Sequence, residues 1–314
     1  MRVLVTGGAG FIGSNLVDAL LDDGHEVQVL DNLSTGRRSN LDVALTRGAV
    51  LHEVDITDAG ALSERLHGAR PEAVFHLAAQ IDVRRSIADP AWDASINVQG
   101  TINVLEAARV HGVERIVNSS TGGAIYGDAE AIPSDERTPP LPEAAYGQSK
   151  LAAEGYLGLY ERLYGQSSVT LRYGNVYGPR QDPLGEAGVV AIFTGLLESG
   201  GRPTVFGDGR QTRDYVYVGD VVAANLAAAQ ADVHGPINVG TGIETDVLAL
   251  IAILRELAGV EDVEPLFAPP RLGELARSCL DITLARDTLG WAPGVTIREG
   301  LRLTFEASRA APAR

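Results

Sequence analysis

The sequence predicts an α/β protein with a doubly wound parallel sheet and a smaller, mixed α/β domain toward the C-terminus. Three observations support this fold class. Short runs rich in valine, isoleucine and leucine recur through the first half without regular polar alternation, as in strands buried on both faces. Stretches with helical periodicity separate these runs, and a glycine-rich turn, VTGGAGFIG, joins the first run to the first helical stretch. Regular alternation of strand and helix implies right-handed crossovers.

Six strands and four helices are expected in the larger domain. The strands are residues 2–6, 26–30, 49–54, 73–78, 115–120 and 168–173. The helices are residues 11–24, 59–68, 96–112 and 144–165. Each helical stretch ends at a glycine (Gly24, Gly68, Gly112 or Gly165), and glycine readily adopts the left-handed conformation that closes many helices.

The alternation loosens after residue 174, where the segment GNVYGPRQDPLGEAG is rich in glycine and proline. A smaller domain is expected to begin there. Residues 236–242, PINVGTG, are typical of a further buried strand that returns to the sheet, so both domains are expected to be discontinuous. Residues 1–174 plus about 214–242 would form the larger domain, and residues 175–213 plus about 243–314 the smaller one.

The composition argues against several classes of partner. The 314 residues carry 26 lysines and arginines against 41 acidic residues, a net charge of -15, which disfavours nucleic acid and anionic membrane surfaces. No apolar run approaches the ~20 residues of a membrane span, and the first run is too short for a signal peptide. Cys279 is the only cysteine, so no internal disulfide can form. A cytoplasmic protein is expected.

The glycine-rich turn has the spacing of a dinucleotide-binding site. Gly7, Gly10 and Gly13 would allow a tight turn, close approach of the backbone to a pyrophosphate, and close packing of helix on strand. The helix begins at Phe11 and Ile12, and its N-terminus would supply donors and a positive dipole end to the phosphates. The context of the turn, after a strand and before a helix, is that of a Rossmann fold.

Asp31 ends the second expected strand and is followed by Asn32. A carboxylate there can accept hydrogen bonds from the adenosine ribose and would repel a 2′-phosphate, so NAD is favoured over NADP. Arg37 and Arg38 lie nearby and weaken that preference.

Two further strand ends are expected to contact the dinucleotide, because ligands of open α/β sheets lie beyond the carboxyl ends of the strands. After the third strand come Asp55 and Ile56, which could flank an adenine. The fourth strand ends around Leu77, Ala78 and Ala79, where the small side chains of the two alanines would let the backbone pass close to the dinucleotide. His76, on the fourth strand itself, is expected to be a buried histidine rather than a catalytic one.

Tyr146 and Lys150 stand four residues apart, on one face of an expected helix. Lys150 is the only lysine of the chain, whereas every other strongly basic residue is arginine. A phenol with a pKa of ~10 is a poor base at neutral pH, but a nearby ammonium favours its phenolate form. The pair therefore suits proton transfer to and from a hydroxyl, and the fifth strand ends with further hydroxyls at Ser120 and Thr121.

Several of these segments together resemble one family. TGGAGFIG, LDNLSTG, HLAAQ, YGQSK, RYGNVYGPRQ and RDYVYVGDV resemble the extended short-chain dehydrogenases/reductases, and more narrowly their NAD-dependent sugar-nucleotide epimerases. The resemblance extends from residue 1 to about 305. It implies inversion of the 4-hydroxyl of UDP-glucose or UDP-galactose through a 4-keto intermediate, with tightly held NAD as the cofactor and no metal.

The resemblance also implies roles for individual residues. Tyr146 would be the acid/base, and Lys150 would bind the nicotinamide ribose and lower the tyrosine pKa. The catalytic hydroxyl falls on Thr121, with Ser120 in reserve, because Gly122 occupies the position where relatives usually carry it. The residues implied to bind the UDP part are Asn175, Arg213 and Arg271 at the diphosphate, Val205 and Phe206 along the uracil, and Glu274 at the ribose.

A gate beside the 2-substituent of the sugar falls on Ser278, seven positions after Arg271. Serine leaves room for an acetamido group, so the N-acetyl forms are expected to be substrates too, and a shift of one residue would move the gate to Arg277 or Cys279. The resemblance further implies a homodimer formed through residues 93–111 and 144–164. Apolar positions expected to serve the sheet and a partner are Ile102, Leu105, Leu157 and Tyr160.

Three alternatives remain at the level of sequence. Dehydratases of the family carry Asp-Glu after the threonine and decarboxylating relatives carry a glutamate there, whereas Gly122 and Gly123 follow Thr121 in this chain. A UDP-uronate epimerase would differ from a UDP-glucose epimerase by only a few atoms of the sugar pocket, so the sequence leaves this activity open. A non-catalytic NAD-sensing module usually lacks the tyrosine–lysine pair that this chain has.

Overall fold

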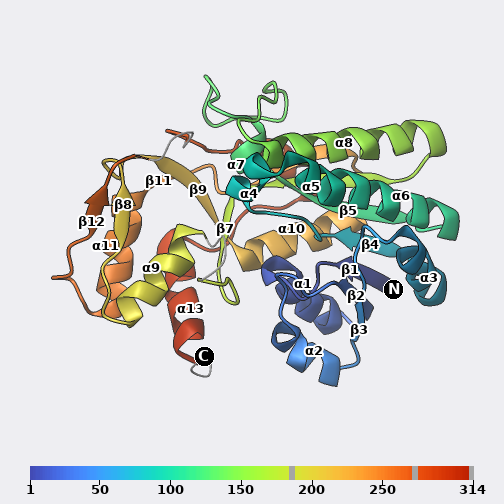
Figure 1. Ribbon diagram of the computed structural model, residues 1–314, viewed down its shortest axis with the longest axis horizontal. Helices are drawn as coiled ribbons and strands as arrows, with labels where there is room; N and C mark the ends of the chain where they lie inside the picture. Colours follow the sequence, from blue (N-terminus) through green and yellow to red (C-terminus); the bar gives the residue numbers. More distant parts are fainter. Residues whose placement is uncertain (184–187, 271–274, 311–314) are drawn as a thin grey trace.

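The computed structural model describes residues 1–183, 188–270 and 275–310 (Figure 1). At its centre lies a seven-stranded, wholly parallel sheet of order β10-β6-β5-β4-β1-β2-β3. Its strands are β1 (Arg2–Thr6), β2 (Glu26–Asp31), β3 (Val50–Glu53), β4 (Ala73–His76), β5 (Arg115–Thr121), β6 (Ser168–Tyr173) and β10 (Gly235–Val239). The six predicted strands and the predicted returning strand are confirmed, the latter as β10 beside β6.

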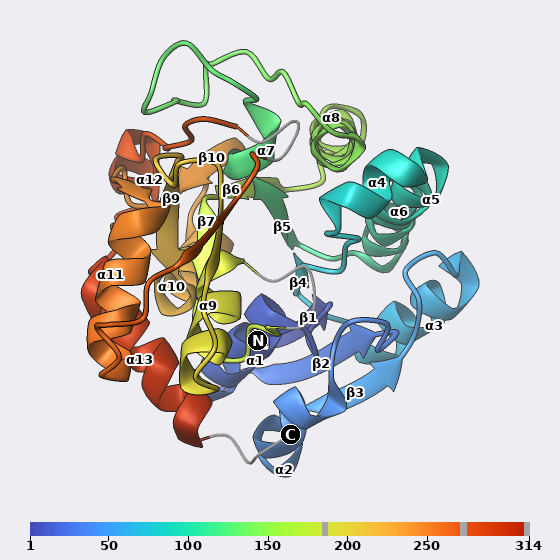
Figure 2. The same cartoon turned by 60° about the vertical axis from the view of Figure 1, so that its left-hand side comes forward.

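Helices cover both faces of this sheet, as predicted for a doubly wound fold (Figures 1 and 2). On one face lie α3 (Ala59–Ala69), α6 (Gly100–His111) and α8 (Ala145–Tyr164). On the other face lie α1 (Phe11–Asp22), α2 (Asp42–Thr46), α10 (Val218–Gln230) and α12 (Thr283–Leu289). Strand β1 supplies Val3 and Val5 to one hydrophobic core and Leu4 to the other, because successive side chains of a strand point to opposite faces.

The helix predicted over residues 96–112 is longer and less regular than expected. After β4 come α4 (Val83–Ala88) and α5 (Pro90–Ala94), then a π-helical turn (Ser95–Gln99) that continues directly into α6. Pro90 occupies the first turn of α5, where its missing N–H is tolerated, and Asp89 caps the helix by accepting from the Trp92 N–H. Two further short helical segments are a 3₁₀ turn (Arg38–Leu41) and α7 (Gly122–Ile125).

One predicted helix end is wrong. Gly68 lies inside α3, and Arg70 instead takes the left-handed conformation (φ 46°) that closes the helix. Pro71 follows, and the residue before a proline is disfavoured in the right-handed helical region, so the helix stops at this point. The other three glycines do adopt the left-handed conformation at or just beyond their helices: Gly24, Gly112 and Gly165.

The smaller lobe contains two short sheets and its own hydrophobic core (Figure 1). A mixed sheet of order β11-β9-β7 combines β7 (Asn175–Tyr177), β9 (Thr212–Tyr217) and β11 (Glu244–Asp246). A parallel pair combines β8 (Thr204–Phe206) and β12 (Leu266–Ala268). The helices of this lobe are α9 (Val189–Glu198), α11 (Val247–Ala258) and α13 (Ile297–Ala310).

The predicted domain boundaries stay a prediction. The segment that carries Ile282, Ala285 and Trp291 packs into the core of the larger lobe, although residues after about 243 were expected to belong to the smaller one. Two ion pairs also join the lobes: Arg37 pairs with Asp182, and Arg180 pairs with Asp18 of α1.

Three of the four apolar residues predicted to serve a partner subunit are not available to one. Leu105, Leu157 and Tyr160 are buried within the single chain, where α6 and α8 pack together. The Tyr160 hydroxyl also donates to Glu106 Oε1 of α6 at 2.6 Å. Only Ile102 remains half-buried. Among the described residues, no helix combines the length and apolarity that crossing a bilayer requires.

Candidate functional site

The glycine turn between β1 and α1 is packed so closely that side chains would not fit. Gly7 has a positive φ of 69°, and a Cβ atom there would lie 2.6 Å from the backbone nitrogen of Ala78. A Cβ atom on Gly13 would overlap the Gly7 carbonyl oxygen. The end of β4 therefore lies directly against the turn, and α1 lies directly against β1. Gly7, Gly13 and Ala78 thus lie close together.

The N-terminus of α1 has no side-chain cap, because Gly10 occupies the capping position. Phe11 and Ile12, both half-buried, form the first turn. The amide groups of a first helical turn have no partner within the helix, and the helix dipole makes this end positive. This part of the structure suits a phosphate group.

Asp31 is buried at the end of β2, and backbone amides hold both of its carboxylate oxygens. Oδ2 accepts from the Ala9 N–H at 2.9 Å, and Oδ1 accepts from the Leu33 N–H at 2.8 Å. Burial raises the pKa of Asp31, although these two hydrogen bonds oppose the shift. A Cβ atom on Gly36 would lie 2.8 Å from Oδ1, so glycine is needed for the loop to pass. The Arg37 side chain pairs with Asp182 and is thereby drawn toward the smaller lobe.

Asn32 and Asp55 join the ends of β2 and β3. Asn32 Nδ2 donates to Asp55 Oδ2 at 2.8 Å, and Thr57 donates to Oδ1 from its backbone N–H and its hydroxyl. Burial raises the pKa of Asp55, but the hydrogen bonds from Thr57 and Asn32 outweigh it and lower the pKa overall. Ile56 is buried in the core, where a Cβ atom on Gly100 would meet its side chain, so the predicted contact of this side chain with an adenine is not supported.

The remaining positions predicted beside the dinucleotide lie at the end of β4. Leu77 is half-buried and packs on the core, Ala78 donates its N–H to the Thr6 hydroxyl at 3.2 Å, and Ala79 is half-buried. These residues, the glycine turn, Asp31 and Asp55 therefore all lie at the carboxyl edge of the parallel sheet.

Tyr146 and Lys150 lie in the first turns of α8, where Tyr146 is half-buried and Lys150 is buried. Burial raises the pKa of Tyr146 to about 12, although a hydrogen bond with the Thr121 side chain opposes the shift. Burial lowers the pKa of Lys150 to about 8, against the attraction of Glu154 and Asp93. Both charged forms are thus disfavoured by burial, and each needs a charge of the opposite sign to persist.

The two hydroxyls at the end of β5 have different partners. Thr121 bonds to Tyr146, whereas Ser120 Oγ donates to Glu154 Oε1 at 2.6 Å. Glu154 in turn forms a buried ion pair with Arg172, at 2.6 Å. Ser120 therefore belongs to a structural network, and Thr121 is the hydroxyl that meets the tyrosine.

The two glycines after Thr121 serve different purposes. A Cβ atom on Gly122 would lie 2.6 Å from the Leu280 side chain, so a hydroxyl-bearing residue would not fit there. A Cβ atom on Gly123 would lie 3.3 Å from Asn175 Oδ1 and 3.9 Å from Thr121 Oγ1. The threonine of the larger lobe and the asparagine of the smaller lobe therefore converge at Gly123.

His76 is a buried strand residue, as predicted. Its Nδ1 lies 2.7 Å from the Thr6 hydroxyl, and its Nε2 lies 3.0 Å from the Thr101 hydroxyl. Burial and the nearby Lys150 lower its pKa to about 3, so the ring is neutral at physiological pH.

The predicted substrate residues of the smaller lobe are spread over short strands. Asn175 begins β7, Arg213 lies on β9 with Nη1 donating to the Thr212 carbonyl at 2.8 Å, and Phe206 ends β8 half-buried. Val205 is 1% exposed in the core, so its side chain does not line a site. Arg271 and Glu274 lie outside the described residues.

Ser278 is half-buried, and its backbone N–H donates to the Thr212 carbonyl at 3.2 Å. Its neighbours face elsewhere: Arg277 pairs with Glu244, and Cys279 is buried beside Asp214, with Sγ 3.9 Å from Oδ2. Of the three positions considered for the gate, only Ser278 has no side-chain hydrogen bond or ion pair among the described residues.

Sequence reasoning missed a buried polar cluster beside Tyr146 and Lys150. Gln80, which follows β4, donates to Asp93 Oδ1 at 2.8 Å, and Asn97 Nδ2 lies 3.3 Å from the same oxygen. Asn97 also donates to Ser149 Oγ at 3.0 Å. The available signal was the spacing of Asp93 and Asn97, four residues apart within a helical stretch that packs on the protein.

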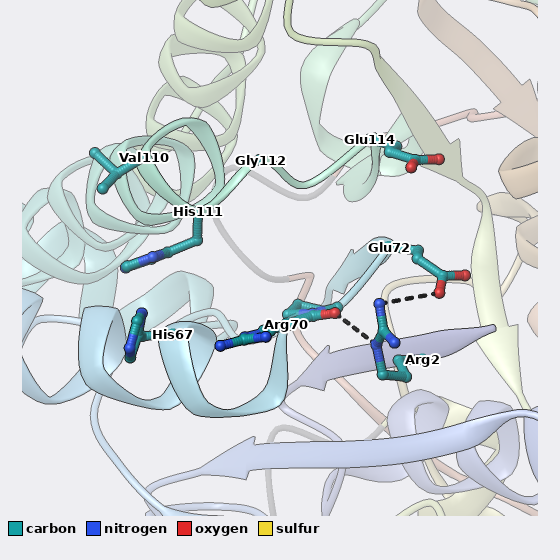
Figure 3. A pocket seen from close by; sticks show the side chains of 9 residues that line it. Arg2, His67, Arg70, Glu72, Val110, His111, Gly112 and Glu114 are labelled. Atoms are coloured by element: carbon teal, nitrogen blue, oxygen red, sulfur yellow. Dashed lines mark hydrogen bonds and ion pairs between the residues drawn. The ribbon is translucent and has the colours of Figure 1, made fainter.

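A separate hollow lies at the opposite, amino edge of the sheet (Figure 3). It lies where β1 and β5 begin and where α3 and α6 end. Arg2 donates from Nε to the Arg70 carbonyl at 2.8 Å and pairs with Glu72 at 3.2 Å, and the rings of His67 and His111 lie 5.4 Å apart. None of the predicted site residues lines this hollow.

Comparison with known proteins agrees with the geometry. The model of the NAD dependent epimerase/dehydratase family matches residues 3–240. The chain is 50% identical to the UDP-glucose 4-epimerase of Mycolicibacterium smegmatis over 311 residues, which cover 98% of this chain and 99% of that protein.

Solved structures are similar throughout. The UDP-glucose 4-epimerase of Thermotoga maritima, crystallised with UDP-glucose, has a TM-score of 0.95 and 48% identity and covers 99% of both chains. The UDP-glucose 4-epimerase of Thermus thermophilus in complex with NAD has a TM-score of 0.92 and 46% identity, over 99% of this chain and 100% of that one.

Proposed function

The chain belongs to the NAD dependent epimerase/dehydratase family, and within it we propose that the chain is an NAD-dependent epimerase that inverts the 4-hydroxyl of a UDP-hexose. UDP-glucose and UDP-galactose are the proposed pair of substrates. The observation that carries the proposal is the hydrogen bond of Tyr146 with Thr121 at the carboxyl end of β5, with the buried Lys150 one turn further along α8.

The residues at this edge fit NAD. The cradle formed by Gly7 and Gly13 would be filled by any Cβ atom, and the uncapped start of α1 suits the pyrophosphate. Asp31 is held by two backbone amides and can accept from a ribose hydroxyl, and Arg37 is paired with Asp182 rather than set aside for a 2′-phosphate. When bound, NAD supplies reversible uptake of a hydride from C4 of the sugar.

The protein's own residues would move the proton. The Tyr146 oxygen would take the proton of the 4-hydroxyl as the 4-keto sugar forms, and would return it after the sugar presents its other face. Thr121, hydrogen-bonded to Tyr146, would hold the same hydroxyl in line. The Lys150 ammonium would stabilise the phenolate, which burial otherwise disfavours.

The UDP part would be bound from the smaller lobe. Asn175 lies next to Gly123 and Thr121, so it connects the diphosphate side with the acid–base pair. Arg213, with Arg271, would donate to the diphosphate oxygens, because guanidinium groups match such oxygens with two parallel hydrogen bonds. Phe206 would contact the uracil and Glu274 the nucleoside ribose.

Elimination chemistry has less support. A dehydratase needs an additional acid/base pair after the threonine, and this chain has Gly122 and Gly123 there. Gly122 is covered by Leu280, and no carboxylate could occupy that position without displacing it.

A homodimer is proposed as well, through the two helical segments expected from the sequence but through other side chains than Leu105, Leu157 and Tyr160. Exposed apolar and aromatic residues on α6 and α8, with their exposed fractions, are Val110 (61%), Leu163 (60%), Tyr164 (53%) and Tyr156 (36%). Light scattering of the purified protein should give the mass of two chains at micromolar concentration, and the mass of one chain would refute this assembly. A cytoplasmic location is proposed on the single cysteine of the chain.

The decisive experiment is turnover of a panel of UDP-sugars, with products resolved by NMR. The wild-type enzyme should interconvert UDP-glucose and UDP-galactose without net consumption of NAD. Tyr146→Phe should lose 10²-fold to 10⁴-fold in turnover, roughly the contribution of a positioned acid/base group, while NAD stays bound. Activity of Tyr146→Phe near that of the wild type would contradict the assignment.

A further inference from the structure

A buried carboxylate lies beside the acid–base pair, and one of its oxygens has no hydrogen-bond partner. Asp93, on α5, is 1% exposed. Its Oδ1 accepts from Gln80 Nε2 at 2.8 Å and lies 3.3 Å from Asn97 Nδ2. Its Oδ2 is buried and forms no hydrogen bond within the described part of the chain. A buried carboxylate oxygen without a hydrogen-bond partner is costly, so its retention calls for an explanation.

The position of Asp93 is fixed by the packing around it. Helix α5 packs against α8, which carries Tyr146 and Lys150. The π-helical turn that follows α5 carries Asn97, whose amide bridges Asp93 to Ser149 Oγ of α8 at 3.0 Å. Gln80 reaches the same carboxylate from the end of β4. Asp93 is thus tied to the end of a sheet strand and to α8.

Other charged groups near the pair have partners of their own, although Glu154 still raises the Lys150 pKa, as Asp93 does. Glu154 of α8 forms an ion pair with Arg172 of β6 and accepts from Ser120 of β5. His76 of β4 is neutral. Arg85 of α4 stacks on the Trp92 ring, with its guanidinium carbon 3.4 Å from the ring centroid.

In the described residues, no arginine or histidine forms an ion pair with Asp93. Its carboxylate is therefore left to act on the two ionisable groups next to it. It stabilises the protonated form of Lys150 and likewise that of Tyr146.

We propose that Asp93 is a positioning residue of the epimerase, whose buried carboxylate sets the pH range in which the Tyr146–Lys150 pair exchanges protons. This proposal rests on the function proposed above. Its second role is to keep Lys150 charged, since an ammonium removed from water would otherwise lose its proton near neutral pH and could no longer stabilise a phenolate.

The sign of the effect follows from charge alone. A carboxylate raises the pKa of every neighbouring acid, so removing its charge lowers the pKa of the Lys150 ammonium and of the Tyr146 phenol together. Because the two groups interact, the two steps of the pH profile belong to the pair. Both limbs of the profile should therefore move to lower pH, whereas a merely structural role would reduce turnover without moving either limb.

Asp93→Asn is the test, measured on the holoenzyme as kcat/KM against pH. Asparagine is nearly isosteric, and its carbonyl oxygen can still accept from Gln80 and Asn97. We expect both limbs to shift by about 1 pH unit toward acid, the lower end of what one nearby charge does to a pKa. Asp93→Ser is a second neutral variant, should asparagine fold poorly. Asp93→Glu, which keeps the charge, should keep the limbs near those of the wild type.

Asp89→Ala is the matched control. Asp89 is an exposed carboxylate at the start of the same helix, and its side chain accepts from the Trp92 N–H at 3.0 Å. Loss of this cap should destabilise α5 and leave the limbs in place. Neutral Asp93 variants that lose turnover with unmoved limbs, or whose limbs move to higher pH, would overturn the proposal.

A readout independent of turnover separates this proposal from the one it rests on. The ultraviolet absorbance of phenolate, taken as the difference between the holoenzyme and its Tyr146→Phe variant, reports ionisation of Tyr146 alone. In the Asp93→Asn background its midpoint should fall as the limbs do, and an unchanged midpoint would overturn the role of Asp93. If Tyr146→Phe retains turnover while the midpoint still falls, the proposed acid/base is wrong and the influence of Asp93 on Tyr146 stands.

Discussion

In the larger lobe, the residues proposed to bind NAD lie mostly at the ends of parallel strands, and the proton-moving Tyr146 and Lys150 lie in the first turns of α8, which packs on β5. Asp31, Asp55 and Lys150 are each held by hydrogen bonds or by buried charges from neighbouring elements. In the smaller lobe, the proposed substrate residues lie on strands of three residues, such as β7 and β8, and in the extended segment around Ser278. The comparison suggests a rigid half that performs the chemistry and an adaptable half that selects the substrate.

The largest expected effect tests the rigid half at Lys150, which is 6% exposed. Lys150→Arg keeps the charge but introduces a larger, planar group whose charge is spread over three nitrogens. Turnover should fall at least 10²-fold, on the order of what a positioned acid–base pair contributes. Arg162→Lys, at an exposed position of the same helix, is the control and should leave turnover unchanged. Full activity of Lys150→Arg would mean that the space around this residue is not restrictive.

The second test concerns the buried ion pair of Arg172 and Glu154, whose side chains are 4% and 8% exposed. Arg172→Leu would leave Glu154 buried without its partner and should lower the free energy of unfolding by about 3–5 kcal/mol. The double variant with Glu154→Leu should recover much of that loss. In the smaller lobe, Arg298→Leu removes an exposed ion pair with Glu256 and should change stability little. Urea titrations that gave equal losses for Arg172→Leu and Arg298→Leu would erase the contrast between the lobes.

The third test uses His76, whose pKa is lowered to about 3 from 6.5 by burial and by Lys150. Between these two values the unfolded chain binds a proton that the folded chain does not, so stability is lost as pH falls below 6.5. At pH 5 this residue alone should account for about 2 kcal/mol relative to pH 7. His76→Asn should remove that part of the acid sensitivity, as measured by urea titrations of both proteins at the two pH values. Identical pH dependence of the two proteins would show that His76 already ionises in the folded state.

The smallest effect is expected in the adaptable half. Ser278→Tyr should reduce kcat/KM for the N-acetyl sugars roughly tenfold relative to UDP-glucose and UDP-galactose, because filled space penalises the larger substrate. Unfolding of this variant should be close to that of the wild type. Ser278→Ala keeps the room and should keep both activities. An equal loss on both classes of sugar, or no loss on either, would show that Ser278 is not the gate.

The same division explains what could be read from the sequence. Buried parallel strands leave continuous apolar runs, so the larger sheet and its returning strand β10 were predictable almost to the residue. Strands β7, β8, β11 and β12 of the smaller lobe have three residues each, too few to show a period, and no strand was anticipated in that lobe. Helix α3 continues past Gly68, which was predicted to end it, and stops just before Pro71.

The site was predictable where a motif fixes the backbone and less so where packing decides. The glycine turn was predictable from its motif, and the position of Tyr146 and Lys150 on one helix face was predictable from their spacing. Burial of Ile56 and Val205 depends on elements distant in sequence. The same holds for the different partners of Ser120, which bonds to Glu154, and Thr121, which bonds to Tyr146. Asp93 left no signal beyond its spacing from Asn97, because its importance arises from α8 packing against α5.

The ion pairs of Arg37 with Asp182 and of Arg180 with Asp18 tie the smaller lobe to the start of the larger one, on either side of the glycine turn. Asn15 of α1 adds a hydrogen bond to the Pro179 carbonyl at 3.2 Å. We expect these contacts to slow the release of a dinucleotide bound at the glycine turn, so its residence should outlast many turnovers. An epimerisation begins and ends at the same oxidation state. With the cofactor retained between cycles, the reaction would be insulated from the ratio of oxidised to reduced NAD in the surrounding solution, and its direction would follow the concentrations of the two sugars alone.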